Sequence, residues 1–148
     1  PLLVRWPGHI AAGSVTDAPM TSPDFYPTLL EAAGLDLLPR QHCDGVSFLP
    51  VLKGETGFQR GPLYWHYPHY GNQGGTPGSS VRSGDWKLIE FHEDSRLELY
   101  NLRDDVGETR NLAATHPDVA RDLRDNLRRW RGEVDARMPQ PNPDCVPW

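Results

Sequence analysis

Hydrophobic residues in the first part of the chain predict a buried strand followed by a helix. Residues 2–4 (Leu-Leu-Val) are consecutive apolar residues, a pattern typical of a strand covered on both faces, as in a parallel α/β sheet. Ser22-Pro23-Asp24 is a helix-start signal, and Gly34 suits the end of the same helix. Apolar residues between them share one face at helical spacing: Tyr26, Leu29, Leu30 and Ala33. We therefore expect a strand–loop–helix unit over residues 2–34.

No later segment supplies further parallel strands or crossover helices for that first strand. The chain also begins inside the strand pattern, with no signal peptide or polar lead-in before it. We therefore expect this sequence to be the end of a longer protein, most of whose large sheet lies upstream.

The pattern changes after residues 35–61, a loop-rich stretch with one short helical turn expected over 48–52. Short strands separated by turns follow, and Gly84-Asp85 is the tight turn of a hairpin. The expected strands cover residues 62–67, 80–83, 86–91 and 97–100. Their close spacing predicts an antiparallel sheet.

A long amphipathic helix completes the predicted structure. Residues 115–117 (Thr-His-Pro) open it, and acidic residues lie early and arginines late, which suits the helix dipole. The arginines are interpreted as a solvated face rather than a site for an anionic partner. The apolar stripe consists of Val119, Leu123, Leu127, Trp130 and Val134. Residues 62–137 are thus expected to form a small antiparallel sheet covered by one helix, and residues 138–148 an extended proline-rich tail.

Composition and charge exclude several classes of protein. The chain of 148 residues carries a net charge of −5, which argues against nucleic-acid binding, because such binding depends on neutralising phosphates. No apolar run approaches the roughly 18 residues that a membrane span needs. The two cysteines, Cys43 and Cys145, cannot build a disulfide framework or a four-thiolate zinc site. They form either one bridge or two unrelated thiols, and we favour the thiols.

Standard catalytic motifs are missing from the sequence. It contains no Gly-x-Ser-x-Gly nucleophile elbow, no phosphate-binding P-loop and no His-Glu-x-x-His zinc motif. Asp104-Asp105 follows a predicted strand, and the alternating oxygen ligands of a calcium loop do not surround it. We therefore interpret these two acids as turn and capping residues.

Residues 64–75 have the most specialised composition in the chain. Aromatic residues, two histidines and amides precede a glycine-rich loop, and sugar sites use such flat apolar faces and hydrogen-bonding groups. His66 and His69 make a poor zinc pair, because Pro68 lies between them and no third ligand follows at suitable spacing. Composition supports equally a sugar site and an aromatic core strand with hydrogen-bonded histidines.

An ordered set of motifs runs from Pro1 to about Pro143. The motifs are VRWPG at 4–8, TDAP at 16–19, DFYPTLL at 24–30, DGVS at 44–47, RSGDWKLI at 82–89, LYNL at 99–102 with Asp105, GE at 107–108 and NL at 111–112. In order and spacing the set resembles the C-terminal third of the type I, formylglycine-dependent sulfatases, which belong to the alkaline phosphatase superfamily. The stretch WHYPHY at 65–70 is similar to sulfatases of bacterial polysaccharide degradation.

The resemblance implies an α/β fold in three parts. Residues 1–61 would be the last strand and helix of a large alkaline-phosphatase-like catalytic domain, with connecting loops. Residues 62–137 would be a small C-terminal domain, in which a four-stranded antiparallel sheet packs against a long helix. Residues 138–148 would be the extended tail.

The resemblance also implies a sulfuric ester hydrolase acting on sulfated carbohydrates or other sulfate esters, in the periplasm or outside the cell. The family's nucleophile is a formylglycine made from the Cys or Ser of a Cys/Ser-x-Pro-x-Arg motif, and a calcium ion assists it. Neither Cys43 nor Cys145 has that context. We therefore expect the nucleophile and the calcium ligands in the missing N-terminal catalytic region, no catalytic or metal-binding residue here, and no activity from this chain alone.

What the resemblance leaves to this chain is substrate recognition at the rim of the pocket. The candidate substrate-binding residues are His66, His69, Tyr70 and Asn72. Arg82 is a weaker candidate, because an arginine in a hairpin is usually a surface charge.

Two alternatives stay open. The first is a phosphatase or phosphodiesterase of the same superfamily, which an upstream Ser or Thr nucleophile outside a Pro-x-Arg context would indicate. The second is a non-catalytic carbohydrate-binding or interaction module that binds through the aromatic strand. That module would be stable as an isolated chain, whereas the strand at residues 2–6 is expected to need sheet neighbours.

Overall fold

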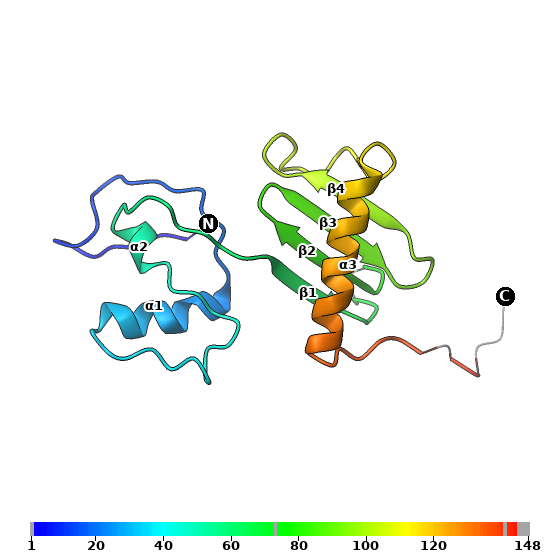
Figure 1. The fold of residues 1–148 in the computed structure, drawn as a ribbon, viewed down its shortest axis with the longest axis horizontal. Coiled ribbons are helices and arrows are strands. Elements are labelled where there is room, and N and C mark those ends of the chain that lie inside the picture. The colour runs from blue at the N-terminus through cyan, green and yellow to red at the C-terminus, as the bar shows by residue number, and fades with distance from the viewer. Residues whose placement is uncertain (1, 73, 141, 145–148) are drawn as a thin grey trace. The chain divides into compact units, whose positions relative to one another are not determined.

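The computed structural model describes residues 2–72, 74–140 and 142–144 (Figure 1). The chain divides into two compact units, Pro1–Arg60 and Gly61–Trp148, and each is described by itself. In the described part of the chain, none of the helices has the length and apolar character needed to cross a membrane.

The first unit contains short helices joined by long loops. Its elements are the 3-10 helix η1 (Ser22–Asp24) and the α-helices α1 (Phe25–Ala32) and α2 (Leu49–Leu52). The predicted helix and the predicted short turn are therefore confirmed. Gly34 has φ +69° just after α1, a backbone conformation that favours glycine and ends the helix.

A buried carboxylate, that of Asp24, organises this unit. The side chain makes no capping hydrogen bond to α1, although an acid at this position suits the helix dipole. Its Oδ2 instead accepts the N–H of Thr21 at 2.9 Å, and its Oδ1 accepts the N–H of Val46 at 2.8 Å. Arg60 donates to the same Oδ1 at 2.9 Å, and the Asp24 side chain is 1% exposed. Asp24 therefore ties two distant loop segments to the start of the helix.

A glycine allows one of these segments to approach the helix start. A Cβ atom on Gly45 would lie 2.3 Å from the backbone oxygen of Pro23, so only glycine fits there without a shift of the backbone. Thr28 holds the following residues, because its Oγ1 accepts the N–H of Phe48 at 3.0 Å. The side of the helix that packs against the rest of the unit therefore carries Thr28 and follows from Asp24, both of which are buried. Leu29, which belongs to the predicted apolar face, is 64% exposed.

The strand predicted at residues 2–6 is not formed in the described structure. Leu3 is 95% exposed, and Leu2 and Val4 are also exposed. A strand forms only where a neighbouring strand accepts its backbone hydrogen bonds, and no described segment pairs with these residues.

The second unit contains one antiparallel sheet with the strand order β1-β2-β3-β4. Its strands are β1 (Leu63–Tyr67), β2 (Gly78–Ser83), β3 (Trp86–Phe91) and β4 (Leu97–Asn101). The four predicted strands are confirmed, and β2 begins two residues earlier than expected. Ser83 pairs with Trp86 across a two-residue turn, in which Gly84 has φ +57°.

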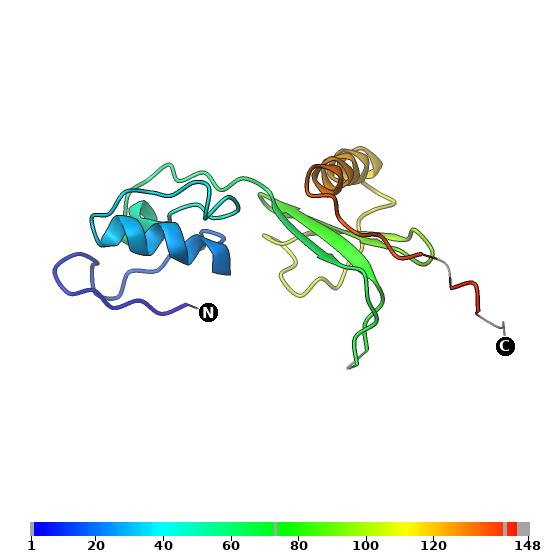
Figure 2. The same ribbon diagram turned by 90° about the horizontal axis from the view of Figure 1, so that it is seen from below.

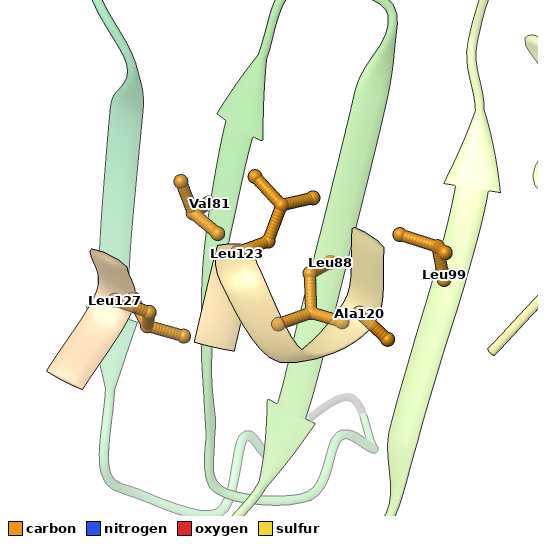
Figure 3. Close-up of a cluster of buried hydrophobic side chains, with 6 residues drawn as sticks. All are labelled: Val81, Leu88, Leu99, Ala120, Leu123 and Leu127. Atoms are coloured by element: carbon orange, nitrogen blue, oxygen red, sulfur yellow. The ribbon is translucent and has the colours of Figure 1, made fainter. Parts of the chain in front are cut away.

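Helix α3 (Pro117–Glu133) covers one face of this sheet (Figure 2). Val81, Leu88 and Leu99 stand opposite one another on β2, β3 and β4, and their side chains meet those of α3. The buried core residues, all drawn in Figure 3, are Val81, Leu88, Leu99, Ala120, Leu123 and Leu127.

The predicted apolar stripe of α3 is confirmed except at its last position. Val119 and Trp130 pack against the core, and the Trp130 ring stacks on Tyr64 of β1 with centroids 4.8 Å apart. Val134 is wrong as a core residue: it lies just beyond the last residue of α3 and is 48% exposed. The helix ends before this residue can turn toward the sheet.

Candidate functional site

Strand β1 presents different side chains on the two faces of the sheet. Tyr64 pairs with Val81 in the row that faces α3, so His66, two residues later, faces α3 as well. Trp65 and Tyr67 point to the other face, where they are 45% and 58% exposed. The aromatic strand therefore has one face in the core and one face at the surface.

His66 is held within the chain through both ring nitrogens. Its Nδ1 lies 2.7 Å from Oγ of Ser79, the residue opposite it on β2. Its Nε2 lies 2.8 Å from the carbonyl oxygen of Arg137, beyond the end of α3. A substrate contact from His66 would have to replace one of these hydrogen bonds.

The other candidate residues lie on the connection between β1 and β2, which extends away from the sheet (Figure 2). His69 is exposed, and its ring meets the Tyr67 ring edge-on with centroids 5.5 Å apart. Tyr70 is 67% exposed, and its hydroxyl group donates a hydrogen bond to the Glu93 carboxylate. Asn72 is exposed. The structure thus places three polar side chains on one exposed segment.

Glycines shape this connection. A Cβ atom on Gly71 would lie 2.9 Å from the backbone oxygen of Gly74, which leaves no room for a side chain. Gly74 and Gly75 have φ +85° and +127°, conformations that other residues rarely adopt. The chain can therefore reverse direction here within a few residues and return to β2.

A buried ion pair lies beside His66 on the helix-covered face. Glu90 of β3 accepts hydrogen bonds from Arg124 and Arg131 of α3, each at 2.6 Å. Burial raises the pKa of the Glu90 carboxyl, but the two arginines outweigh it, so its pKa lies below the ordinary value. Burial, with the neighbouring Arg131, lowers the pKa of the His92 imidazole. Glu90 is therefore charged and His92 neutral near pH 7.

Sequence reasoning missed four polar residues of this cluster: Ser79, Glu90, His92 and Arg131. Ser79 and Glu90 stand in the same cross-strand row as His66. The alternation of residues along each strand predicts which face of the sheet a side chain is on. Only the strand register shows which residues of different strands are neighbours.

Asp105 has the turn role expected of it. Its carboxylate accepts the N–H groups of Thr109 and Arg110, with distances of 2.9 Å to Oδ2 in each case. The hydrogen bond from the Thr109 N–H, followed by that from the Arg110 N–H, lowers the pKa of the Asp105 carboxyl. Arg82, the weaker candidate, donates from Nε to the carbonyl oxygen of Gly84 at 3.3 Å.

Metal ligands and cysteines are the other chemical groups of interest in the sequence. Among them, no group of three or more His, Cys, Asp or Glu side chains is arranged to hold a metal ion. Cys43 is exposed and free, and Cys145, the other half of the suggested disulfide, lies outside the described residues.

The family of the chain follows from its sequence, and its fold agrees. The fold is similar to that of a solved structure from Bacteroides thetaiotaomicron described as a "putative sulfatase", with a TM-score of 0.65 and 24% identity over 81% of this chain and 27% of that structure. Residues 1–133 match the family model described as "N-sulphoglucosamine sulphohydrolase, C-terminal". The chain belongs to this sulfatase family.

Individual relatives agree with the family. A sulfatase of Formosa agariphila is 36% identical over 99% of this chain and 31% of its own length. An N-acetylglucosamine-6-O-sulfatase of Bacteroides thetaiotaomicron is 33% identical over 76% of this chain and 21% of its own length. The chain thus spans less than a third of these curated relatives.

The fold is shared with a related class of hydrolase. The phosphonate monoester hydrolase SpPMH from Silicibacter pomeroyi is 25% identical, with a TM-score of 0.64. The match covers 87% of this chain and 28% of that structure. The fold of this part therefore does not by itself separate sulfate from phosphonate chemistry.

Proposed function

We propose that this chain is the C-terminal part of a sulfatase that hydrolyses sulfate esters of carbohydrates. The observation that carries the proposal is the family match over residues 1–133. The two names quoted above, a sulphoglucosamine sulphohydrolase and an acetylglucosamine sulfatase, favour an amino-sugar substrate. The nucleophile and the calcium ion that sulfatases use would come from the rest of the protein, and a location in the periplasm or outside the cell suits such a substrate.

We further propose that the β1–β2 connection contributes to the rim of the substrate pocket. His69 and Asn72 are exposed and carry hydrogen-bonding groups that match sugar hydroxyls and sulfate oxygens. The exposed rings of Tyr67 and Tyr70 supply flat apolar faces for the sugar. His66 lies on β1, next to Tyr67. It would contact the substrate only by giving up its hydrogen bond to Ser79 or to Arg137.

The reaction class is tested with the full-length protein that carries this chain. We expect it to release sulfate from a 6-O-sulfated glucosamine about tenfold or more faster than it hydrolyses a phosphonate or phosphate monoester. The measurement is kcat/KM for each substrate. The opposite preference would contradict the sulfatase proposal and favour the phosphatase or phosphodiesterase alternative, which the likeness to the phosphonate monoester hydrolase supports.

His69→Ala tests the rim. In the full-length enzyme we expect kcat/KM on the sulfated sugar to fall about ten- to a hundredfold, because hydrogen bonds to the substrate worth roughly 1–3 kcal/mol are lost. A small aryl sulfate, which would not reach the rim, should lose much less. The melting temperature should change little, since His69 is exposed.

His66→Ala separates the two roles open to that residue. A substrate contact predicts a loss on the sugar alone, of the same size as for His69→Ala. A packing role predicts equal losses on both substrates, together with a melting temperature lower by several degrees, as about 1 kcal/mol would produce. Equal losses would remove His66 from the rim.

A further inference from the structure

Ser79 is the centre of a polar network on the helix-covered face of the sheet. Its Oγ lies 2.7 Å from Nδ1 of His66 and 3.0 Å from Nε2 of His92, which follows β3. Arg131 of α3 donates to the same oxygen at 3.3 Å, and its second terminal nitrogen donates to Glu90 at 2.6 Å. Ser79 is 2% exposed, so these protein groups, rather than solvent, satisfy its hydroxyl.

The chemistry of the partners determines the direction of two of these hydrogen bonds. The carbonyl oxygen of Arg137 can only accept, so Nε2 of His66, 2.8 Å away, carries the proton. Arg131 can only donate, so Oγ of Ser79 accepts from it. The single hydroxyl proton of Ser79 is then shared out between the two imidazoles, one of which accepts it while the other donates to Oγ.

The network closes the base of the β1–β2 connection. His66 and Ser79 are cross-strand partners at the two ends of this connection. The backbone N–H of His92 donates to the carbonyl oxygen of Pro77 at 2.9 Å, which holds the returning chain. Within the connection, backbone hydrogen bonds join Gly71 to Gly74 and Gly75 at 3.2 and 3.4 Å.

We propose that Ser79 is a positioning residue for the substrate rim, acting through His66 and His92. By joining β1, β3 and α3 at the base of the connection, it holds residues 68–72 and 74–77 in the conformation that presents His69, Tyr70 and Asn72. The role of these three residues rests on the proposed function, whereas the coupling between Ser79 and the connection does not.

A charged His92 is disfavoured by its surroundings. The positive groups that face it are Arg131 and, when protonated, His66, and both lower its pKa in addition to burial. Glu90 opposes them, but its carboxylate is already shared by Arg124 and Arg131. A histidine whose pKa is lowered in the folded state stabilises that state above its ordinary pKa of about 6.5, and this contribution falls as the pH falls below it.

Hydrogen exchange of the full-length protein tests the coupling without substrate. In Ser79→Ala we expect the backbone amides of residues 69–72 and 74–76 to exchange about fivefold or more faster than in the wild type, because one or two hydrogen bonds at the base are lost. In the wild type we expect protection of the same amides, corrected for intrinsic exchange, to fall between pH 7.5 and pH 5.5.

Ser80→Ala is the matched control, because Ser80 is the next residue of β2 and faces the other side of the sheet. Its amides at residues 69–72 and 74–76 should exchange as in the wild type, and the amides of β3 should stay protected in both variants. Equal exchange in Ser79→Ala and Ser80→Ala would overturn the proposal. If Ser79→Ala does not fold, unchanged wild-type protection between the two pH values would overturn it.

Kinetics then separate this inference from the proposed function. We expect Ser79→Ala to lower kcat/KM on the sulfated sugar about tenfold, mainly through KM, with a much smaller effect on a small aryl sulfate. Faster exchange with unchanged kinetics on the sugar would support the coupling between Ser79 and the connection, and would contradict the proposed role of the connection in substrate binding. Unchanged exchange would overturn the coupling, whatever the kinetics on either substrate.

Discussion

Asp24→Ala is expected to lower the local free energy of unfolding of the first unit by about 3–5 kcal/mol. The substitution removes a carboxylate that is 1% exposed and leaves the guanidinium of Arg60, 8% exposed, without its charged partner. Removing one member of a buried pair costs this much because the remaining charge stays desolvated. The N–H groups of Thr21 and Val46 lose their acceptor as well. Hydrogen exchange of the α1 amides in the full-length protein measures the effect.

Two further variants test the explanation. Asp24→Asn keeps an acceptor oxygen but loses the charge, so an intermediate loss is expected. Asp36→Ala changes an exposed aspartate just after α1 and should alter the free energy by less than about 0.5 kcal/mol. A loss in Asp36→Ala equal to that in Asp24→Ala would contradict the role assigned to the buried carboxylate.

Leu88→Ala is expected to destabilise the sheet and helix of the second unit by about 3–5 kcal/mol. Leu88 is 0% exposed and lies between Val81 and Leu99 under α3 (Figure 3). The substitution removes buried methyl groups and leaves a cavity that the flanking strands and the helix can close only in part. The slowest-exchanging amides of β2 and β3 report the change directly.

Ile89→Ala provides the matched control on the same strand. Ile89 is the next residue of β3, faces away from α3 and is only partly buried. Removal of a side chain of the same size should therefore cost about half as much or less. Equal losses in the two variants would contradict the assignment of the core to the helix-covered face.

The sheet and the long helix could be predicted because their signals are local. Gly84-Asp85 between two apolar runs indicates a tight hairpin, and the spacing of Leu123 and Leu127 indicates a helix face. The exact start of β2 could not be predicted in the same way. Gly78 joins the strand because it pairs with Tyr67 and Phe91, and those pairings are long-range.

The candidate site was predictable only as a segment. Its composition indicates exposed hydrogen-bonding groups, and the structure does place His69 and Asn72 at the surface. The internal hydrogen bonds of His66 depend on Ser79 and on the carbonyl oxygen of Arg137, 71 residues away along the chain. No local pattern carries that information, because these contacts arise when the strands pair and the helix packs.

The sequence by itself determined the order and type of the elements in the second unit, the sulfatase resemblance and the segment with sugar-binding composition. These follow from periodicity, turn residues and motif order, each of which acts over a few residues. Only the tertiary structure decided that residues 2–6 pair with no described strand, that Asp24 binds Arg60 rather than capping α1, and that Ser79 joins His66 to Arg131. The physical reason is that hydrogen-bond partners and buried charges are selected by proximity in space, which a local pattern does not contain.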